Sequence, residues 1–120
     1  MNTLQNYHIE FKVKTLFNRD FKILYSMNDA LSGYITEHNT PKLVNSLLIE
    51  INSVLNCEKS LGGWDTQGMH LAKIEPEETK VYSDLELYEK NEKIIPNCIL
   101  PTKDFRTIVE AWKDFVETEN

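Results

Sequence analysis

Hydrophobic and polar residues alternate in the first part of the chain. Ile9, Phe11 and Val13 are separated by charged residues, which is the period-two pattern of a half-buried strand. The tripeptide at residues 18–20, Asn-Arg-Asp, is typical of a turn. After this turn, alternate positions are again apolar, at Phe21, Ile23 and Tyr25. The pattern predicts a β-hairpin over residues 6–26.

A first amphipathic helix is predicted over residues 41–57. Thr40-Pro41 favours a helix start, because the Thr hydroxyl can accept a backbone N–H bond and Pro is preset for the first turn. The apolar stripe that follows has the three- and four-residue spacing of one helix face. Its members are Leu43, Leu47, Leu48, Ile51, Val54 and Leu55.

A second amphipathic helix closes the chain. Thr102 is expected to cap it, and Asp104 in its first turn complements the helix dipole. Its apolar stripe consists of Phe105, Ile108, Val109, Trp112, Phe115 and Val116. We therefore expect Trp112 in the hydrophobic core.

Three more strands are expected between these helices. Two of them cover residues 68–75 and 79–88, joined by a turn at Glu75-Pro76-Glu77-Glu78. The third is the apolar run 94–100, which Pro96 places at a sheet edge or a bulge because Pro lacks the backbone donor. Residues 27–39 fit either a short helix capped near Asn28 or a loop around Gly33.

The element order is β-β-α-β-β-β-α. Strands so close in sequence pair mainly antiparallel, since a parallel return needs a crossover of about a dozen residues. We expect an α+β fold in a single domain, residues 1–120, with one mainly antiparallel sheet of about five strands. Two amphipathic helices would cover one sheet face, and the other would stay partly open to solvent or a partner.

Composition and charge narrow the functional class. The chain has 120 residues, of which 41% are hydrophobic and 27% charged, as in ordinary globular proteins. Residues 1–60 carry six basic and six acidic residues, whereas residues 61–120 carry seven and thirteen, so the second half supplies the whole net charge of -6. We expect this charge to form one acidic face that attracts basic proteins and disfavours direct nucleic-acid binding.

Cysteine usage and hydropathy indicate the compartment. No signal peptide is visible, and no stretch approaches the roughly 18 apolar residues that span a bilayer. Cys57 and Cys98 lie far apart in a chain large enough to fold without a disulfide. We expect a reduced, cytoplasmic setting with no membrane contact.

The segment 81–88 is the main candidate for a contact surface. In a strand, alternate side chains share a face, and the outward face here would carry two tyrosines and two carboxylates. Its members are Tyr82, Asp84, Glu86 and Tyr88. Tyrosines offer contact area and carboxylates pair with Lys or Arg of a partner, although a solvated outer face explains the same pattern.

Two neighbouring features extend this candidate surface. The carboxylates of the preceding turn, Glu75, Glu77 and Glu78, either join the contact or form a solvated loop. Trp64, beside Gly62-Gly63, either anchors an interface or caps the core.

Catalytic and metal-binding motifs are missing from the sequence. His8, His38 and His70 have no metal-ligand spacing, and there is no Gly-rich phosphate loop. We therefore expect no enzyme, no cofactor and no metal. An enzyme with an unfamiliar site would require a pocket that unites His70 with a carboxylate such as Asp65.

The end of the chain carries a family resemblance. Residues 94–105 read IIPNCILPTKDF and lead into IVEAWKDF at 108–115. This block resembles the last strand and helix of small bacterial immunity proteins that accompany secreted polymorphic or contact-dependent growth-inhibition toxins. A Pro-Thr-type entry, an Asp-Phe pair and a later Trp and Phe recur there, and the hairpin with Ile9-Glu10-Phe11 is also similar.

The resemblance implies a protein that binds and neutralises a cognate toxin in the producing cell. The charge agrees, because a nuclease toxin needs a basic groove for its substrate and an acidic protein can occupy that groove. The alternative is a non-catalytic adaptor or regulatory subunit that binds another protein through the open sheet face. An immunity gene is expected directly downstream of a toxin gene, which separates the two hypotheses.

Overall fold

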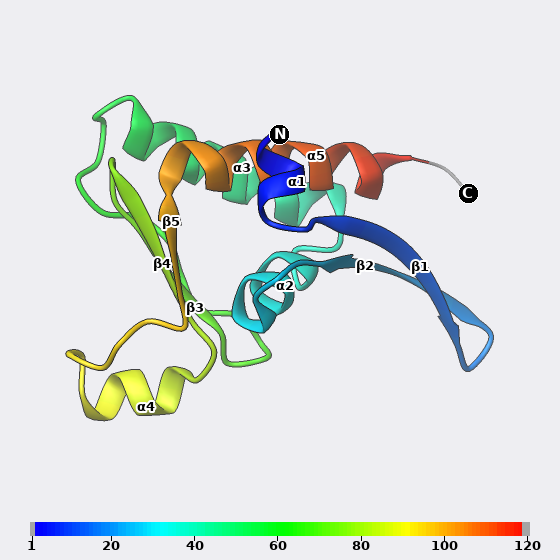
Figure 1. Cartoon of the computed structure of the whole chain (residues 1–120), viewed down its shortest axis with the longest axis horizontal. Coiled ribbons are helices and arrows are strands. Elements are labelled where there is room, and N and C mark those ends of the chain that lie inside the picture. The colour runs from blue at the N-terminus through cyan, green and yellow to red at the C-terminus, as the bar shows by residue number, and fades with distance from the viewer. Residues whose placement is uncertain (1, 119–120) are drawn as a thin grey trace.

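The computed structural model describes residues 2–118, and over these residues it has five helices and five strands (Figure 1). In chain order they are α1 (Thr3–Asn6), β1 (Glu10–Leu16), β2 (Arg19–Tyr25), α2 (Asp29–Thr36), α3 (Pro41–Leu55), β3 (Leu71–Ile74), β4 (Glu78–Tyr82), α4 (Leu85–Lys90), β5 (Cys98–Pro101) and α5 (Thr102–Glu117). The fold is α+β, and all strand pairs are antiparallel. Three short helices, α1, α2 and α4, are added to the expected order.

The strands form two sheets, which corrects the expectation of a single sheet. β1 and β2 make a two-stranded sheet, and β3, β4 and β5 make a three-stranded sheet in that order. At the outer edge of β2, a side chain of α2 bonds the strand backbone. Thr36 Oγ1 accepts from Leu24 N at 3.0 Å and donates to Leu24 O at 3.3 Å. This side chain satisfies backbone groups that a neighbouring strand would otherwise need.

The predicted hairpin is confirmed, with its turn one residue earlier than expected. Leu16 pairs with Arg19, and Phe17 and Asn18 form the two-residue loop with φ of 52° and 63°. Positive φ at both positions defines a type I′ turn, whose twist matches that of the strands. The hairpin projects from the body of the molecule, at the right of Figure 1.

α3 and α5 pack side by side as a helical layer (Figure 1), and the three-stranded sheet is contacted by α5 and by α2. Thr40 caps α3 as predicted, accepting from Leu43 N at 3.2 Å. Trp112 is fully buried, and its indole donates to His38 O at 2.8 Å. Thr102 does not cap α5, because it is the first helical residue and its hydroxyl bonds Thr79 Oγ1 and the Glu75 carbonyl.

The region predicted as one strand over 79–88 is a strand followed by a helix. β4 ends at Tyr82, and Asp84 caps α4 by accepting from Leu87 N at 3.2 Å. Asp at the cap, Glu86 in the first turn and Lys90 in the last suit a helix, and here they outweigh the alternating apolar pattern. The third strand is at the sheet edge as predicted, but it begins at Cys98.

Residues 27–39 contain the short helix α2 rather than a loop. Asn28 caps it, accepting from Leu31 N at 3.1 Å. Gly33 is inside this helix, and the His70 ring packs against it so closely that an added Cβ would lie 2.5 Å from His70 Nε2. Among residues 2–118, no helix has both the length and the hydropathy needed to cross a membrane.

Candidate functional site

The two tyrosines predicted to face a partner pack against each other instead. Tyr82 is only 3% exposed, and its ring centroid lies 4.8 Å from that of Tyr88 on α4. Lys73 Nζ lies 5.4 Å from the centroid of the Tyr88 ring on the same sheet face. The tyrosines therefore fasten α4 to the sheet, and the four-residue strand face predicted from the sequence does not form.

Asp84 and Glu86 remain exposed, on a lobe that we define as residues 83–97. No residue of this α4 lobe is buried, and it projects from the sheet at the lower left of Figure 1. Backbone bonds fix its base: Leu85 N donates to Met69 O at 2.8 Å and Asn97 N donates to Val81 O at 2.9 Å. Large apolar side chains are exposed on it, with Leu87 at 53% and Ile95 at 86%.

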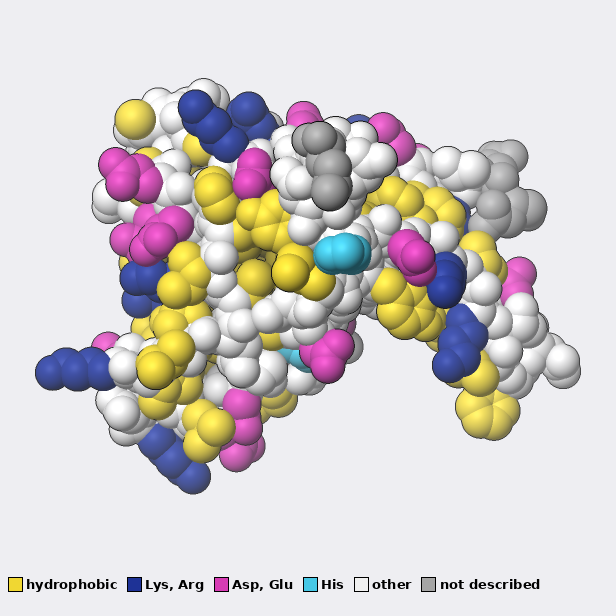
Figure 2. Space-filling model, viewed as in Figure 1, with side chains coloured by type: hydrophobic (Ala, Val, Ile, Leu, Met, Phe, Trp, Pro, Cys, Tyr) yellow, Lys and Arg dark blue, Asp and Glu magenta, His cyan; other side chains and the backbone are white. Residues whose placement is uncertain are grey.

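The carboxylates of the β3–β4 turn are not part of the α4 lobe. β4 runs between them, so the turn and the lobe lie at opposite ends of that strand (Figure 1). Lys80 Nζ lies 3.4 Å from Glu75 and 3.9 Å from Glu78, and Glu77 accepts from Thr102 N through its carbonyl. On the face shown in Figure 2, acidic side chains are scattered rather than gathered, which corrects the expectation of one acidic face there.

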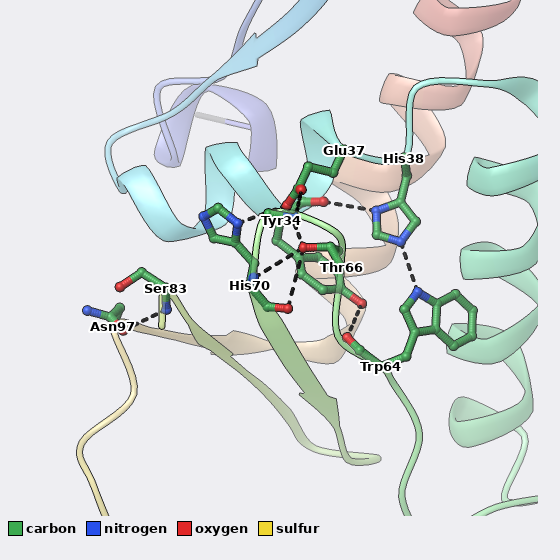
Figure 3. Close-up of polar contacts among 9 residues, drawn as sticks. Tyr34, Glu37, His38, Trp64, Thr66, His70, Ser83 and Asn97 are labelled. Carbon is green, nitrogen blue, oxygen red and sulfur yellow. Dashed lines mark hydrogen bonds and ion pairs between the residues drawn. The ribbon is translucent and has the colours of Figure 1, made fainter. Parts of the chain in front are cut away.

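Trp64 is half-buried and packs against the core, where it contacts His38. Its indole Nε1 donates to His38 Nε2 at 3.0 Å, and His38 Nδ1 donates to Tyr34 O at 2.9 Å (Figure 3). An indole only donates and a carbonyl only accepts, so this geometry requires neutral His38 with its proton on Nδ1. Burial lowers the pKa of His38 below its usual value, which favours the same neutral form.

Glu37 ties the loop at residues 65–70 to the end of α2. Its carboxylate accepts from Thr66 Oγ1 at 2.5 Å, from Gly68 N at 2.5 Å and from His70 Nδ1 at 2.8 Å (Figure 3). The carboxylate that meets His70 is thus Glu37, not Asp65. Because all three bonds hold the loop in place, we assign this pair a structural role.

A pocket of about 440 Å³ opens between this loop and the junction of α2 and α3. Residues that line it include Glu37, His38, Leu43, Trp64, Asp65 and Gln67. Trp64 caps part of the core, which is one of the two roles considered for it, and it also lines this pocket; a role as an interface anchor stays a prediction. Within residues 2–118, no three His, Cys, Asp or Glu side chains are grouped as a metal site would require.

Sequence reasoning missed the polar cluster because its members are distant in sequence. Trp64 and His38 are 26 residues apart, and His70 and Glu37 are 33 apart. Local spacing therefore carries no sign of either contact. Both depend on the way the 65–70 loop returns to α2.

The tip of the hairpin is a second exposed feature that the pattern did not predict. Phe17 is 94% exposed, and Phe21 and Tyr25 are each 40% exposed. The strand register places Phe21 and Tyr25 on the same side as Lys12 and Lys14. Dark blue and yellow side chains accordingly lie along the projecting hairpin in Figure 2.

No family model matches the chain, and comparisons with curated proteins and with solved structures found no match either.

Proposed function

We propose that the chain is an immunity protein: it binds a cognate secreted toxin and neutralises it in the cytoplasm of the producing cell. The observation that carries this proposal is the α4 lobe, which projects from the body and exposes acidic and apolar side chains together. Exposed apolar groups next to charges are typical of surfaces that become buried against another protein.

The charge of the lobe favours a basic partner. It carries four acidic residues, Asp84, Glu86, Glu89 and Glu92, against two lysines, Lys90 and Lys93, which gives -2. The whole chain is at -6. A basic toxin surface, such as the substrate groove of a nuclease, would be attracted over a distance and then meet Leu87 and Ile95 at close range.

A binding role also agrees with the hydrogen bonds of the titratable side chains near the pocket, which connect parts of the chain to one another. His38 and His70 each have a nitrogen bonded within the chain, and the Glu37 carboxylate accepts three bonds. These bonds order the 65–70 loop beside the lobe, where Met69 O receives the N–H of Leu85. We propose that the chain acts without catalysis, cofactor or metal.

The direct test is growth rescue. The protein encoded immediately upstream would be expressed in a host cell with and without this chain. We expect growth arrest without the chain and restored growth with it, together with a complex that survives size-exclusion chromatography. A harmless upstream product, or a toxic one that the chain neither binds nor neutralises, would rule the proposal out.

The adaptor hypothesis is favoured by a different surface. Ile99 on the edge strand β5 is 52% exposed and pairs with Lys80, on the sheet face opposite the buried Val81 and Leu100. An adaptor that docks there should lose its partner on Ile99→Lys and keep it when the α4 lobe is changed. An immunity protein that uses the lobe should show the opposite result.

A further inference from the structure

We infer that the pocket beside Trp64 binds a guanidinium group, the chemistry of an arginine side chain. The pocket, at about 440 Å³, is within the size range of small-ligand sites. Trp64 and two carboxylates, Glu37 and Asp65, line it, and among residues 2–118 no Lys or Arg lies within 4.0 Å of either carboxylate. The inference rests on the way each lining side chain is already bonded.

The aromatic wall has no free hydrogen-bonding group. The single donor of Trp64, its Nε1–H, is bonded to His38, whose other nitrogen is bonded to Tyr34 O. What remains of Trp64 for a ligand is therefore its π surface. Trp is the aromatic side chain that attracts cations most strongly, and the flat guanidinium also stacks on it.

The negative charge comes from two carboxylates that differ in how many hydrogen bonds they accept from the chain. Glu37 is held by three hydrogen bonds from the chain, so it contributes charge but has little spare acceptor capacity. Asp65 lines the pocket, is exposed, and has no ion-pair partner within 4.0 Å among residues 2–118. Its carboxylate is free to accept the paired N–H groups of a guanidinium.

The rim of the pocket suits the rest of an arginine side chain. Leu43, 43% exposed, offers apolar contact for the methylene stem. Asn39 and Gln67 are exposed at the pocket, and their amide oxygens can accept the remaining guanidinium N–H groups. An anion would be repelled by the two carboxylates, and an apolar ligand would desolvate Asp65 without a bond in return.

The guanidinium can come from an arginine of a protein partner or from a small free molecule. The first source rests on the proposed function, because the 65–70 loop is bonded to the base of the α4 lobe, where Met69 O accepts from Leu85 N. A basic toxin would then place an arginine in the pocket while its surface meets the lobe. Binding of a free guanidinium compound does not depend on that function.

The test is an NMR titration of the ¹⁵N-labelled chain with N-acetyl-arginine amide. We expect concentration-dependent shifts of the Trp64 indole N–H and of the Asp65 and Gln67 amides, while Trp112, fully buried, serves as an internal reference. N-acetyl-citrulline amide has the same shape without the charge and should leave these signals in place. Equal shifts with both probes, or none with the arginine probe, would overturn the inference.

Single substitutions test which side chains of the pocket contribute to the affinity for the guanidinium probe. Asp65→Asn should raise the dissociation constant about two- to fivefold, the range for one partly exposed charge pair. Trp64→Leu should raise it by up to roughly 30-fold through loss of the cation–π contact. Glu110→Gln, at an exposed carboxylate on α5, is the matched control and should leave it unchanged. Asp65→Asn behaving like Glu110→Gln would contradict the assignment.

The source of the guanidinium is decided by adding the probe to the toxin complex. If an arginine of the toxin occupies the pocket, the complexed chain should no longer respond to N-acetyl-arginine amide. If the probe still binds, the pocket serves a free molecule and the toxin uses the lobe alone. A toxin that binds while the probe never does would refute the pocket and leave the proposed function standing.

Discussion

His38 is held between a carbonyl oxygen and an indole N–H, and only its neutral form satisfies both contacts. Burial lowers the pKa of His38 below 6.5, against smaller raising effects of the Tyr34 carbonyl and the Glu37 carboxylate. Below pH 6.5 the unfolded chain therefore binds a proton at His38 before the folded chain does. The stabilising contribution is complete above pH 6.5 and is lost as pH falls toward the folded pKa.

As pH falls from 6.5 to 5.5, we expect the free energy of unfolding to decrease by up to about 1.4 kcal/mol from this one proton, with little change between pH 7.5 and 6.5. Urea denaturation at a series of pH values measures it. His38→Gln should be less stable but should show a flatter pH dependence. His8→Asn, at an exposed histidine, should keep the wild-type slope. An unchanged slope in His38→Gln would refute this explanation.

Phe17 occupies a turn position that costs stability. It has a positive φ of 52° and its side chain is 94% exposed, so the strained backbone is not offset by burial. Asn tolerates this conformation and is common in type I′ turns. Phe17→Asn should raise the free energy of unfolding by about 0.5–1 kcal/mol, measured by thermal and urea unfolding.

Phe21→Asn is the comparison for this change, because it replaces a β-favourable aromatic that is 40% exposed within β2. It should destabilise the chain. If Phe17→Asn also destabilises, the Phe17 ring has a packing role that its exposure does not show.

At the scale of elements, a lysine of the hairpin caps the last helix. α5 has no basic residue in its own last turn. Lys22 Nζ from β2 donates to the carbonyls of Phe115 at 2.7 Å, Val116 at 3.1 Å and Thr118, and lies 5.2 Å from the centroid of the Phe115 ring. A cation at this helix end stabilises both the open carbonyls and the dipole.

Lys22→Met keeps the apolar stem and removes the charge. It should lower the free energy of unfolding by about 1 kcal/mol. Lys14→Met removes an exposed charge from the same hairpin and should change it by no more than about 0.5 kcal/mol. Urea denaturation compares the two. Equal effects would mean that the contacts of Lys22 with α5 do not contribute to stability.

Elements with strong periodicity were predictable, and short elements were not. α3 and α5 follow long apolar stripes, and the hairpin follows two alternating runs, so tertiary contacts only adjusted their ends. α4 is six residues long, and its Leu85 and Leu87 fit a strand as well as a helix. Asp84 and Glu86 carried the signal for a helix start, but their negative charge fitted a contact surface equally well.

The candidate site was predictable only in part. The position of Trp64 after the glycines indicated an interface anchor or a cap on the core, and its packing against the core agrees with the second. The partners of Trp64 depend on the pairing of distant segments, which local pattern cannot supply. Glu75 and Glu77 lie in the predicted turn, but Glu78 is in β4, and Asp84 and Glu86 belong to the cap and first turn of α4 rather than to a strand. The spacing of these carboxylates along the sequence did not indicate that β4 keeps the two groups apart.

At the scale of the whole molecule, charge is divided between ends rather than between faces. The hairpin, residues 10–25, carries four basic and two acidic residues, a balance of +2, which leaves -8 for the rest of the chain. The hairpin and the α4 lobe lie at opposite sides of the molecule in Figure 1. A basic partner should therefore be drawn to the side of the lobe and away from the hairpin.

Two matched double variants separate the effect of where the acidic residues lie from the effect of the total net charge. Glu86→Lys with Glu89→Lys changes the lobe, and Glu110→Lys with Asp114→Lys changes exposed positions on α5; each pair changes the net charge from -6 to -2. Asp84 is left intact because its side chain caps α4. Equal thermal stability of the variants is the check that both still fold.

The most direct test is the affinity of these two variants for the upstream toxin, measured by isothermal titration calorimetry at fixed salt. If the lobe is the contact, the lobe variant should lose about 2 kcal/mol of binding free energy, roughly 30-fold, while the α5 variant stays near wild type. Equal losses in both variants, or no loss in either, would contradict recognition of a basic partner by the α4 lobe.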